Sequence, residues 1–202
     1  MKRVSLTFDD GPWIDTTPKV IEVLERYDLP ATFMIWGQHA LKYPNLLKRE
    51  AQNAKFSFGN HTLNHVHLTG LKNVEIHDEI LENDNLINAL IGRIPNYIRP
   101  PFGEYNENVV NCSKDRPLII WSLDTRSWEH HSSSQVLKQI DHVQDGDVIL
   151  MHDFQKADAD ALEDVIKTLQ AKNFEISSLK SLFEPSDINN KTVVCSRSEY
   201  IE

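Results

Sequence analysis

The sequence predicts an α/β fold, a distorted (β/α)7-8 barrel that forms a single domain. The 202 residues are 40% hydrophobic and 25% charged, which suits one globular domain with a sizeable core. Apolar segments typical of strands alternate along the chain with segments of helical periodicity, and this order indicates a mostly parallel sheet with crossover helices. About seven such strands in one domain favour a closed or nearly closed barrel over an open sheet.

The hydrophobic pattern places the individual elements. Val4, Leu6 and Phe8 alternate with polar neighbours, as in a strand with one buried face. The expected strands are 3–8, 31–36, 55–58, 96–99, 117–122, 147–151 and 174–177. The expected helices lie within 15–27, 39–53, 73–91, 132–143 and 158–172, with a short one ending at 183. We expect one folded domain over 1–184 and a polar tail over 185–202 that is disordered or a small appendage.

Charge and composition narrow the classes of partner. The formal net charge of −9 argues against nucleic acid or an anionic membrane as the main partner. No apolar run approaches the roughly 18–20 residues needed to span a bilayer. The N-terminus has no apolar signal-peptide region, so we expect a cytoplasmic protein, or a secreted or cell-wall protein only if the chain is an excised domain. Cys112 and Cys195 are far apart and are expected to be reduced thiols.

Polar side chains recur at the ends of the expected strands, where barrel enzymes and open α/β sheets bind their ligands. They are Asp9, Asp10, His61, Arg99, Asp124 and His152. If the barrel forms, these side chains meet at one end of it.

His61 and His65 are the first candidates for metal ligands. Side chains four residues apart share one face of a helical turn, so we expect the two imidazoles to point the same way. A hydrolytic metal centre usually needs a third protein ligand and an open position for water. His67 is a less favoured ligand, because it would point away from the pair. Such pairs also arise by chance, and a purely structural role for either histidine stays open.

Three other segments could complete a hydrolytic site. Asp9 and Asp10 are adjacent carboxylates, so one can bind a metal while the other faces a water molecule; the alternative is a turn with capping aspartates. Arg99 could hold a carboxylate ionised and oriented, unless it is simply exposed beside a proline-rich turn. The backbone N–H of Phe102 could stabilise an oxyanion. His152, at the end of an expected buried strand, could protonate a leaving group or be a structural histidine.

The tryptophans are candidates for stacking on sugar rings. Trp13 and Trp128 are the better candidates, because core packing is the more natural role for Trp36 and Trp121.

Five short motifs, in this order, make the chain resemble the polysaccharide deacetylases with a NodB homology domain, carbohydrate esterase family 4. They cover about three quarters of the chain, from residue 7 to residue 152. The motifs are Thr7-Phe8-Asp9-Asp10-Gly11, His61-Thr62-Leu63-Asn64-His65, Arg99-Pro100-Pro101-Phe102-Gly103, Asp124-Thr125-Arg126-Ser127-Trp128 and Leu150-Met151-His152.

The resemblance implies an N-deacetylase that depends on a divalent metal and acts on an acetylated carbohydrate. It implies Asp10, His61 and His65 as the metal ligands, with Zn²⁺ expected and Co²⁺ or Ni²⁺ as alternatives. The remaining implied roles follow the motifs. Asp9, held by Arg99, would be the general base, and His152 would be the general acid. Asp124 would be a further catalytic carboxylate, and the backbone N–H of Phe102 would be the oxyanion donor. Trp128 and Leu150 would line the acetyl pocket.

Ser127 departs from the family pattern, which has aspartate there to support the histidine acid. Without that carboxylate the imidazolium lacks a charge partner. Either Asp124 or Asp153 compensates, or activity is reduced or tuned to another substrate. We therefore expect Ser127→Asp to move the alkaline limb of the pH–rate profile upward.

Other functions stay open at this point. The fold could serve an O-acetyl xylan esterase or a hydrolase of another non-peptide C–N bond. A non-catalytic carbohydrate-binding relative is a further alternative, which only Ser127 favours. Two histidines and a carboxylate also form the facial triad of non-haem iron enzymes, but a base and an acid have no obvious use there. The oligomeric state cannot be predicted from this sequence.

Overall fold

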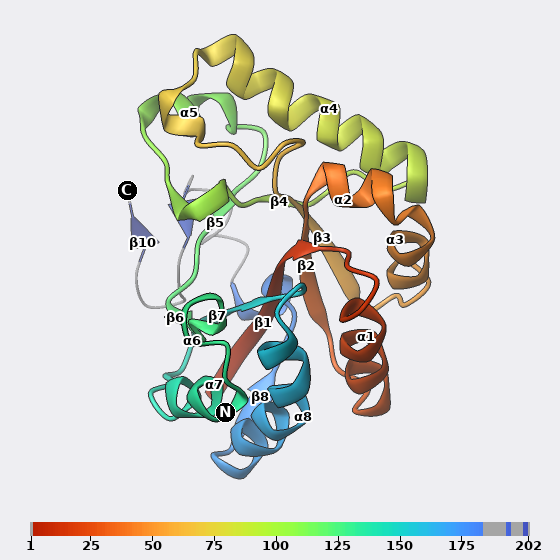
Figure 1. Ribbon diagram of the computed structural model, residues 1–202. Coiled ribbons are helices and arrows are strands. Elements are labelled where there is room, and N and C mark those ends of the chain that lie inside the picture. The colour runs from red at the N-terminus through yellow and green to blue at the C-terminus, as the bar shows by residue number, and fades with distance from the viewer. Residues whose placement is uncertain (1, 184–192, 195–199, 202) are drawn as a thin grey trace.

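The computed structural model describes residues 2–183, 193–194 and 200–201 (Figure 1). The predicted fold class is confirmed, because a curled, mostly parallel sheet forms a half-barrel with helices around it. The strand order is β10-β9-β5-β4-β3-β2-β1-β7-β6, and β8 also pairs with β1. Only β10 and β9 pair antiparallel among the described strands.

The strands of the domain are β1 Lys2–Gly11, β2 Ala31–Ile35, β3 Phe56–Asn60, β4 Tyr97–Ile98, β5 Leu118–Ile119, β6 Leu123–Asp124, β7 Val148–His152 and β8 Phe174–Ile176. The helices are α1 Thr17–Arg26, α2 Gly37–Lys42, α3 Pro44–Glu50, α4 Asn73–Ile91, α5 Glu107–Cys112, α6 Ser127–His130, α7 Ser133–Ile140, α8 Lys156–Ala171 and α9 Leu179–Leu182, with 3-10 turns at Leu68–Gly70 and Pro101–Gly103.

Strand β1 is the centre of the sheet. It pairs in parallel with β2, β7 and β8, and its residues from Val4 to Gly11 are all buried. Both faces of this strand are covered, because Ser5 and Thr7 are buried as well as the apolar residues between them, and their hydroxyls donate to the backbone oxygens of Ser177 and Ile149. The rings of Phe8 and Phe33 stack at 5.4 Å in this core, and Phe56 meets Phe33 edge-on at 5.2 Å. This packing fixes the position of the carboxyl end of β1, which carries Asp9 and Asp10.

Several predicted elements are divided in the structure. The helix expected over 39–53 is two helices, α2 and α3, which meet at Tyr43; Pro44 begins α3 because proline suits a first helical turn. The strand expected over 117–122 is shorter, and a separate strand, β6, pairs with β7. Helices α5 and α6 were not predicted.

The expected tail, 185–202, lies mostly outside the described residues. Its described part belongs to the sheet: Val193–Val194 (β9) pairs in parallel with β5, and Tyr200–Ile201 (β10) pairs with β9. Val193 and Val194 are buried, so these residues pack with the domain. Cys112 carries a free thiol, while Cys195 lies outside the described residues.

None of the helices in the described ranges has the length and apolar character to cross a membrane.

Candidate active site and metal centre

Both aspartates of the site lie at the carboxyl end of β1. Asp9 is buried and is the register partner of His152 on β7. The pairing of β1 with β2 shifts between Asp9 and Gly11, and Asp10 has a left-handed φ of 69°. Neighbours in a regular strand point to opposite faces, whereas a bulge re-aims a side chain. Here both carboxylates approach His61, whose Nε2 lies 3.7 Å from Asp9 Oδ2 and 3.3 Å from Asp10 Oδ1.

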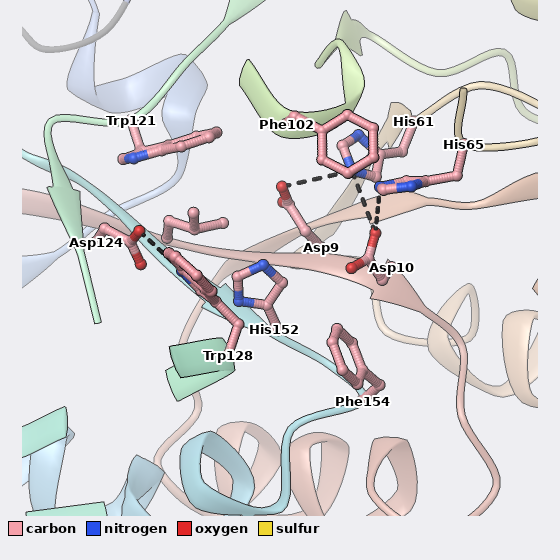
Figure 2. Close-up of a pocket in the computed structure, with 11 residues that line it drawn as sticks. Asp9, Asp10, His61, His65, Phe102, Trp121, Asp124, Trp128, His152 and Phe154 are labelled. Atoms are coloured by element: carbon pink, nitrogen blue, oxygen red, sulfur yellow. Dashed lines mark hydrogen bonds and ion pairs between the residues drawn. The ribbon is translucent and has the colours of Figure 1, made fainter. Parts of the chain in front are cut away.

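Asp10, His61 and His65 form a group whose candidate ligand atoms all lie within 4.8 Å of one another (Figure 2). Asp10 Oδ1 is 3.0 Å from His65 Nε2, yet this buried oxygen has no hydrogen bond of good geometry among the described residues. His61 Nδ1 lies 2.7 Å from the carbonyl oxygen of Arg99, which makes Nδ1 the donor and leaves Nε2 for a metal. One carboxylate and two imidazoles therefore fit a divalent cation.

Charge within this group depends on protonation. Burial alone would raise the pKa of Asp10, but His61 and His65 lower that pKa well below its ordinary value. Burial also tends to lower the pKa of His61, while Asp9 and Asp10 raise it above its ordinary value. Protons therefore compete with a cation for the His61 ring, and the affinity of this group for a metal falls as the pH drops.

The expected helical turn at His61 and His65 was wrong. His61 directly follows β3, and His65 lies in a loop before Leu68–Gly70. Thr62 and His65 have left-handed φ values of 64° and 54°, and with this backbone both rings reach Asp10. His67 lies outside the ligand group, because its Nδ1 contacts Glu104 at 2.9 Å.

Arg99 holds Asp9, as the sequence suggested, but it is completely buried rather than exposed. Its Nη1 donates to Asp9 Oδ1 at 2.5 Å and to Thr7 Oγ1 at 2.9 Å, and its Nε donates to the backbone oxygen of Ile119 at 2.8 Å. These bonds fix the guanidinium beside Asp9 and hold the Asp9 side chain in one orientation. Asp9 Oδ2 stays directed toward His61.

A cavity of about 440 Å³ brings the site together. Every predicted site residue except Arg99 lines it: Asp9, Asp10, His61, His65, Phe102, Asp124, Trp128, Leu150 and His152. This volume is in the range of small-molecule sites. Trp121 and Phe154 also line the cavity and were missed as site residues, since Trp121 looked like a core residue in the sequence. Its position two residues after β5 was the signal that could have placed it at the site.

The walls of the cavity are shaped by aromatic side chains. Trp128 is 48% exposed, and its Nε1 donates to Asp124 Oδ2 at 3.1 Å (Figure 2). Asp124 thus orients Trp128, and its other oxygen accepts the backbone N–H of Arg126. On the opposite side, Phe102 is 49% exposed and packs edge-on against the His65 ring at 4.8 Å. The two exposed rings flank the opening, which suits a flat, ring-shaped ligand.

Ser127 lies beside the site but does not line the cavity. It is completely buried and donates a hydrogen bond to Asp158, in the first turn of α8. Asp158 also accepts the backbone N–H of His152 at 2.7 Å. Asp158 was missed because nothing in the local sequence relates it to position 127.

A parallel half-barrel that carries an Asp-His-His group, an arginine-held aspartate and a histidine in one cavity has the parts of a metal-dependent hydrolase. The family model for polysaccharide deacetylases matches residues 1–118. The chain therefore belongs to the polysaccharide deacetylase family, as the motifs suggested.

Named relatives agree with this membership. The chain is 35% identical over 191 residues to a peptidoglycan-N-acetylglucosamine deacetylase of Bacillus cereus, a match that covers 91% of this chain and 69% of the relative. Listeria monocytogenes PgdA, another peptidoglycan-N-acetylglucosamine deacetylase, is 33% identical, and the match covers 90% of this chain but 39% of that protein. A chitooligosaccharide deacetylase of Bradyrhizobium is 30% identical, with 90% of each chain covered.

The solved structure of the peptidoglycan deacetylase PdaC from Bacillus subtilis has the same fold. It superposes with a TM-score of 0.84 at 29% identity, over 90% of this chain and 89% of that one.

Proposed function

We propose that this chain is a zinc-dependent hydrolase that removes acetyl groups from N-acetylglucosamine units of oligosaccharides or peptidoglycan and releases acetate. Its relatives are named as peptidoglycan-N-acetylglucosamine and chitooligosaccharide deacetylases, which supports an N-acetylated sugar as substrate. The observation that carries the proposal is that Asp9 and His152 line the same cavity as the Asp10, His61 and His65 group.

Asp9 acts as the general base. Arg99 donates to Asp9 Oδ1, so Oδ2 is the oxygen that accepts a proton from the attacking water. A zinc ion held by Asp10, His61 and His65 would polarise the acetamido carbonyl and make the water more acidic. We choose zinc because catalytic zinc sites commonly have three such ligands and an open position, although Co²⁺ and Ni²⁺ accept the same donors.

His152 acts as the general acid. An amine is a poor leaving group unless it is protonated, so the amide nitrogen must receive a proton as the C–N bond breaks. His152 reaches the cavity from β7, a strand away from the base, so neither residue has to perform both roles. The backbone N–H of Phe102 is our candidate for the oxyanion donor, and Trp128 and Leu150 flank the acetyl methyl group.

Acetate release tests this function. The purified chain would be incubated with N-acetylglucosamine oligomers of different lengths and with peptidoglycan, before and after chelation and after added zinc. We expect release that chelation abolishes and zinc restores. Absence of release from every acetylated sugar, with metal bound, would overturn the proposal. Preferential release from acetylated xylan would instead identify an O-acetyl esterase.

A further inference from the structure

The carboxylate expected at position 127 to support His152 is absent, but a different carboxylate is hydrogen-bonded to this histidine. Asp158 Oδ2 accepts two hydrogen bonds, from the backbone N–H of His152 and from Ser127 Oγ. All of Asp158 is buried, and it lies in the first turn of the 16-residue helix α8. Its charge therefore comes from α8 instead of from the segment that holds Ser127.

Two buried polar atoms of this pair have no partner among the described residues. They are His152 Nδ1 and Asp158 Oδ1. Buried polar atoms without partners are rare and costly, so each needs an explanation. The structure records no hydrogen bond or ion pair between the His152 ring and Asp158 among the described residues, so this buried carboxylate acts on the ring through its charge. The backbone bond already holds the two residues together.

We propose that Asp158 is the positioning residue for His152, replacing the aspartate that the family pattern has at position 127. Asp158 holds the backbone of His152 and supplies the negative charge that stabilises the imidazolium, while the ring delivers the proton to the leaving amine. This proposal rests on the proposed function in one respect, which is that the proton of His152 goes to the leaving amine of the deacetylation.

Burial disfavours the ionised form of Asp158, and neighbouring polar groups counter this effect. Burial raises the pKa of Asp158 above its ordinary value, but the hydroxyl of Ser127 and the backbone N–H of His152 oppose that rise. The N-terminus of α8 also stabilises negative charge in its first turn.

Serine at position 127 is part of this arrangement. A carboxylate there would face Asp158 Oδ2 in a site without water access, where like charges repel strongly. Ser127 instead donates a hydrogen bond to Asp158. Serine at position 127 is therefore compatible with a buried carboxylate at position 158, whereas aspartate at position 127 is not.

The other carboxylates near His152 have different partners. Asp124 binds Trp128, and Asp153 Oδ2 accepts the hydroxyl of Thr17 at 2.7 Å. Asp9 on β1 is engaged by Arg99. Asp10, His61 and His65 also face the cavity that His152 lines. Neither Asp124 nor Asp153 makes a recorded hydrogen bond to His152 within the described ranges, so the compensation expected from one of them is better assigned to Asp158.

Asp158→Asn tests the proposal, because asparagine keeps the shape and removes the charge. We expect the NMR titration midpoint of the His152 ring, assigned with His152→Ala, to fall by about one pH unit or more. Turnover should fall by about tenfold or more, but by less than the ~10²–10⁴-fold that a general acid contributes, and the alkaline limb should move to lower pH. Asp164→Asn is the matched control, because Asp164 is an exposed aspartate on the same helix. Asp158→Glu, which keeps the charge, should hold the midpoint even if Asp158→Asn is poorly folded.

Ser127→Asp gives an independent test. We now expect this change to lower the melting temperature and the turnover. The double variant Ser127→Asp with Asp158→Ser should recover part of both. An unchanged His152 midpoint in folded Asp158→Asn would overturn the proposal. So would a stable Ser127→Asp variant whose alkaline limb moves upward. If the wild type releases no acetate, the proposed function fails, whereas the ring titration still decides the role of Asp158.

Discussion

Arg99 has the largest side chain among the fully buried residues, and it links the core of the sheet to the chemistry of the site. It donates to a threonine hydroxyl, to a backbone oxygen and to the base Asp9. A guanidinium has five donors in a fixed plane, and lysine could not reproduce this set. Orientation of the base therefore depends on a residue that does not line the cavity.

Asp9→Asn should separate chemistry from metal binding. Asparagine keeps the size of the side chain but cannot accept a proton from water, so we expect turnover to fall by about 10²–10⁴-fold. Zinc binding, measured by calorimetry, should change little, because Asp10, His61 and His65 are intact. Asp15→Asn, at an exposed position, is the control. Retained turnover in Asp9→Asn would show that another group is the base.

Arg99→Met should unfold the protein more easily. It leaves the buried carboxylate of Asp9 without its partner, which costs about 3–5 kcal/mol in comparable buried pairs. Combining it with Asp9→Asn should cost less than the sum of the two single changes, because the uncompensated charge is gone. Urea unfolding of the four proteins measures this. Strict additivity would mean that the pair contributes no coupling.

At the scale of elements, helix α4 supports the loop that carries the two histidines. Asn83 Nδ2 donates to the backbone oxygen of Ile35 at 2.9 Å and to Asn60 Oδ1 at 3.0 Å. Asn60 Oδ1 also accepts the backbone N–H of Thr62 at 2.8 Å, and Asn60 Nδ2 donates to Asp84 at 2.7 Å. These buried bonds connect α4 to the last residue of β3, immediately before His61.

Asn83→Ala should therefore weaken both the fold and the metal site. Loss of these buried hydrogen bonds should lower the free energy of unfolding by about 1–3 kcal/mol. Zinc affinity should fall by about 10–100-fold, as for other residues that support metal ligands. Asn85→Ala is the control, because it makes the same change in helix propensity at an exposed position of α4. Equal zinc affinity in the two variants would disprove the supporting role of Asn83.

The sequence predicted the elements near the site better than the way they join. Asp9, His61, Arg99 and His152 were found because parallel strands place their ends together. The loop from His61 to His65 was mistaken for a helical turn, since its left-handed residues include Thr62, a type that rarely marks such a backbone. Asp158 was missed because its contact with position 127 spans 31 residues of sequence.

At the scale of the whole molecule, Glu50 and Asp153 are buried carboxyl groups with raised pKa values. Glu50 ends α3, is completely buried, and neither of its oxygens has a hydrogen-bond partner among the described residues. Burial raises its pKa well above the ordinary value, and Asp153 raises it further. Burial likewise raises the pKa of Asp153 to about 7. Glu50 was not singled out from the sequence, because its burial follows from how α3 packs against the domain, and Asp153 was considered only as a partner of His152.

Glu50→Gln should change how stability depends on pH. Below the ordinary glutamate pKa near 4.5, Glu50 is neutral in both states and contributes no pH dependence. Above it, the unfolded chain releases the proton while the folded chain keeps it, so wild-type stability falls with rising pH until the folded pKa is passed. This loss approaches about 1.4 kcal/mol per pH unit. Urea unfolding at a series of pH values above 4.5 should show Glu50→Gln gaining stability relative to the wild type as the pH rises. The difference between Glu22→Gln, at an exposed position of α1, and the wild type should not change with pH. A constant difference between Glu50→Gln and the wild type across that range would mean that Glu50 is ionised in the folded protein.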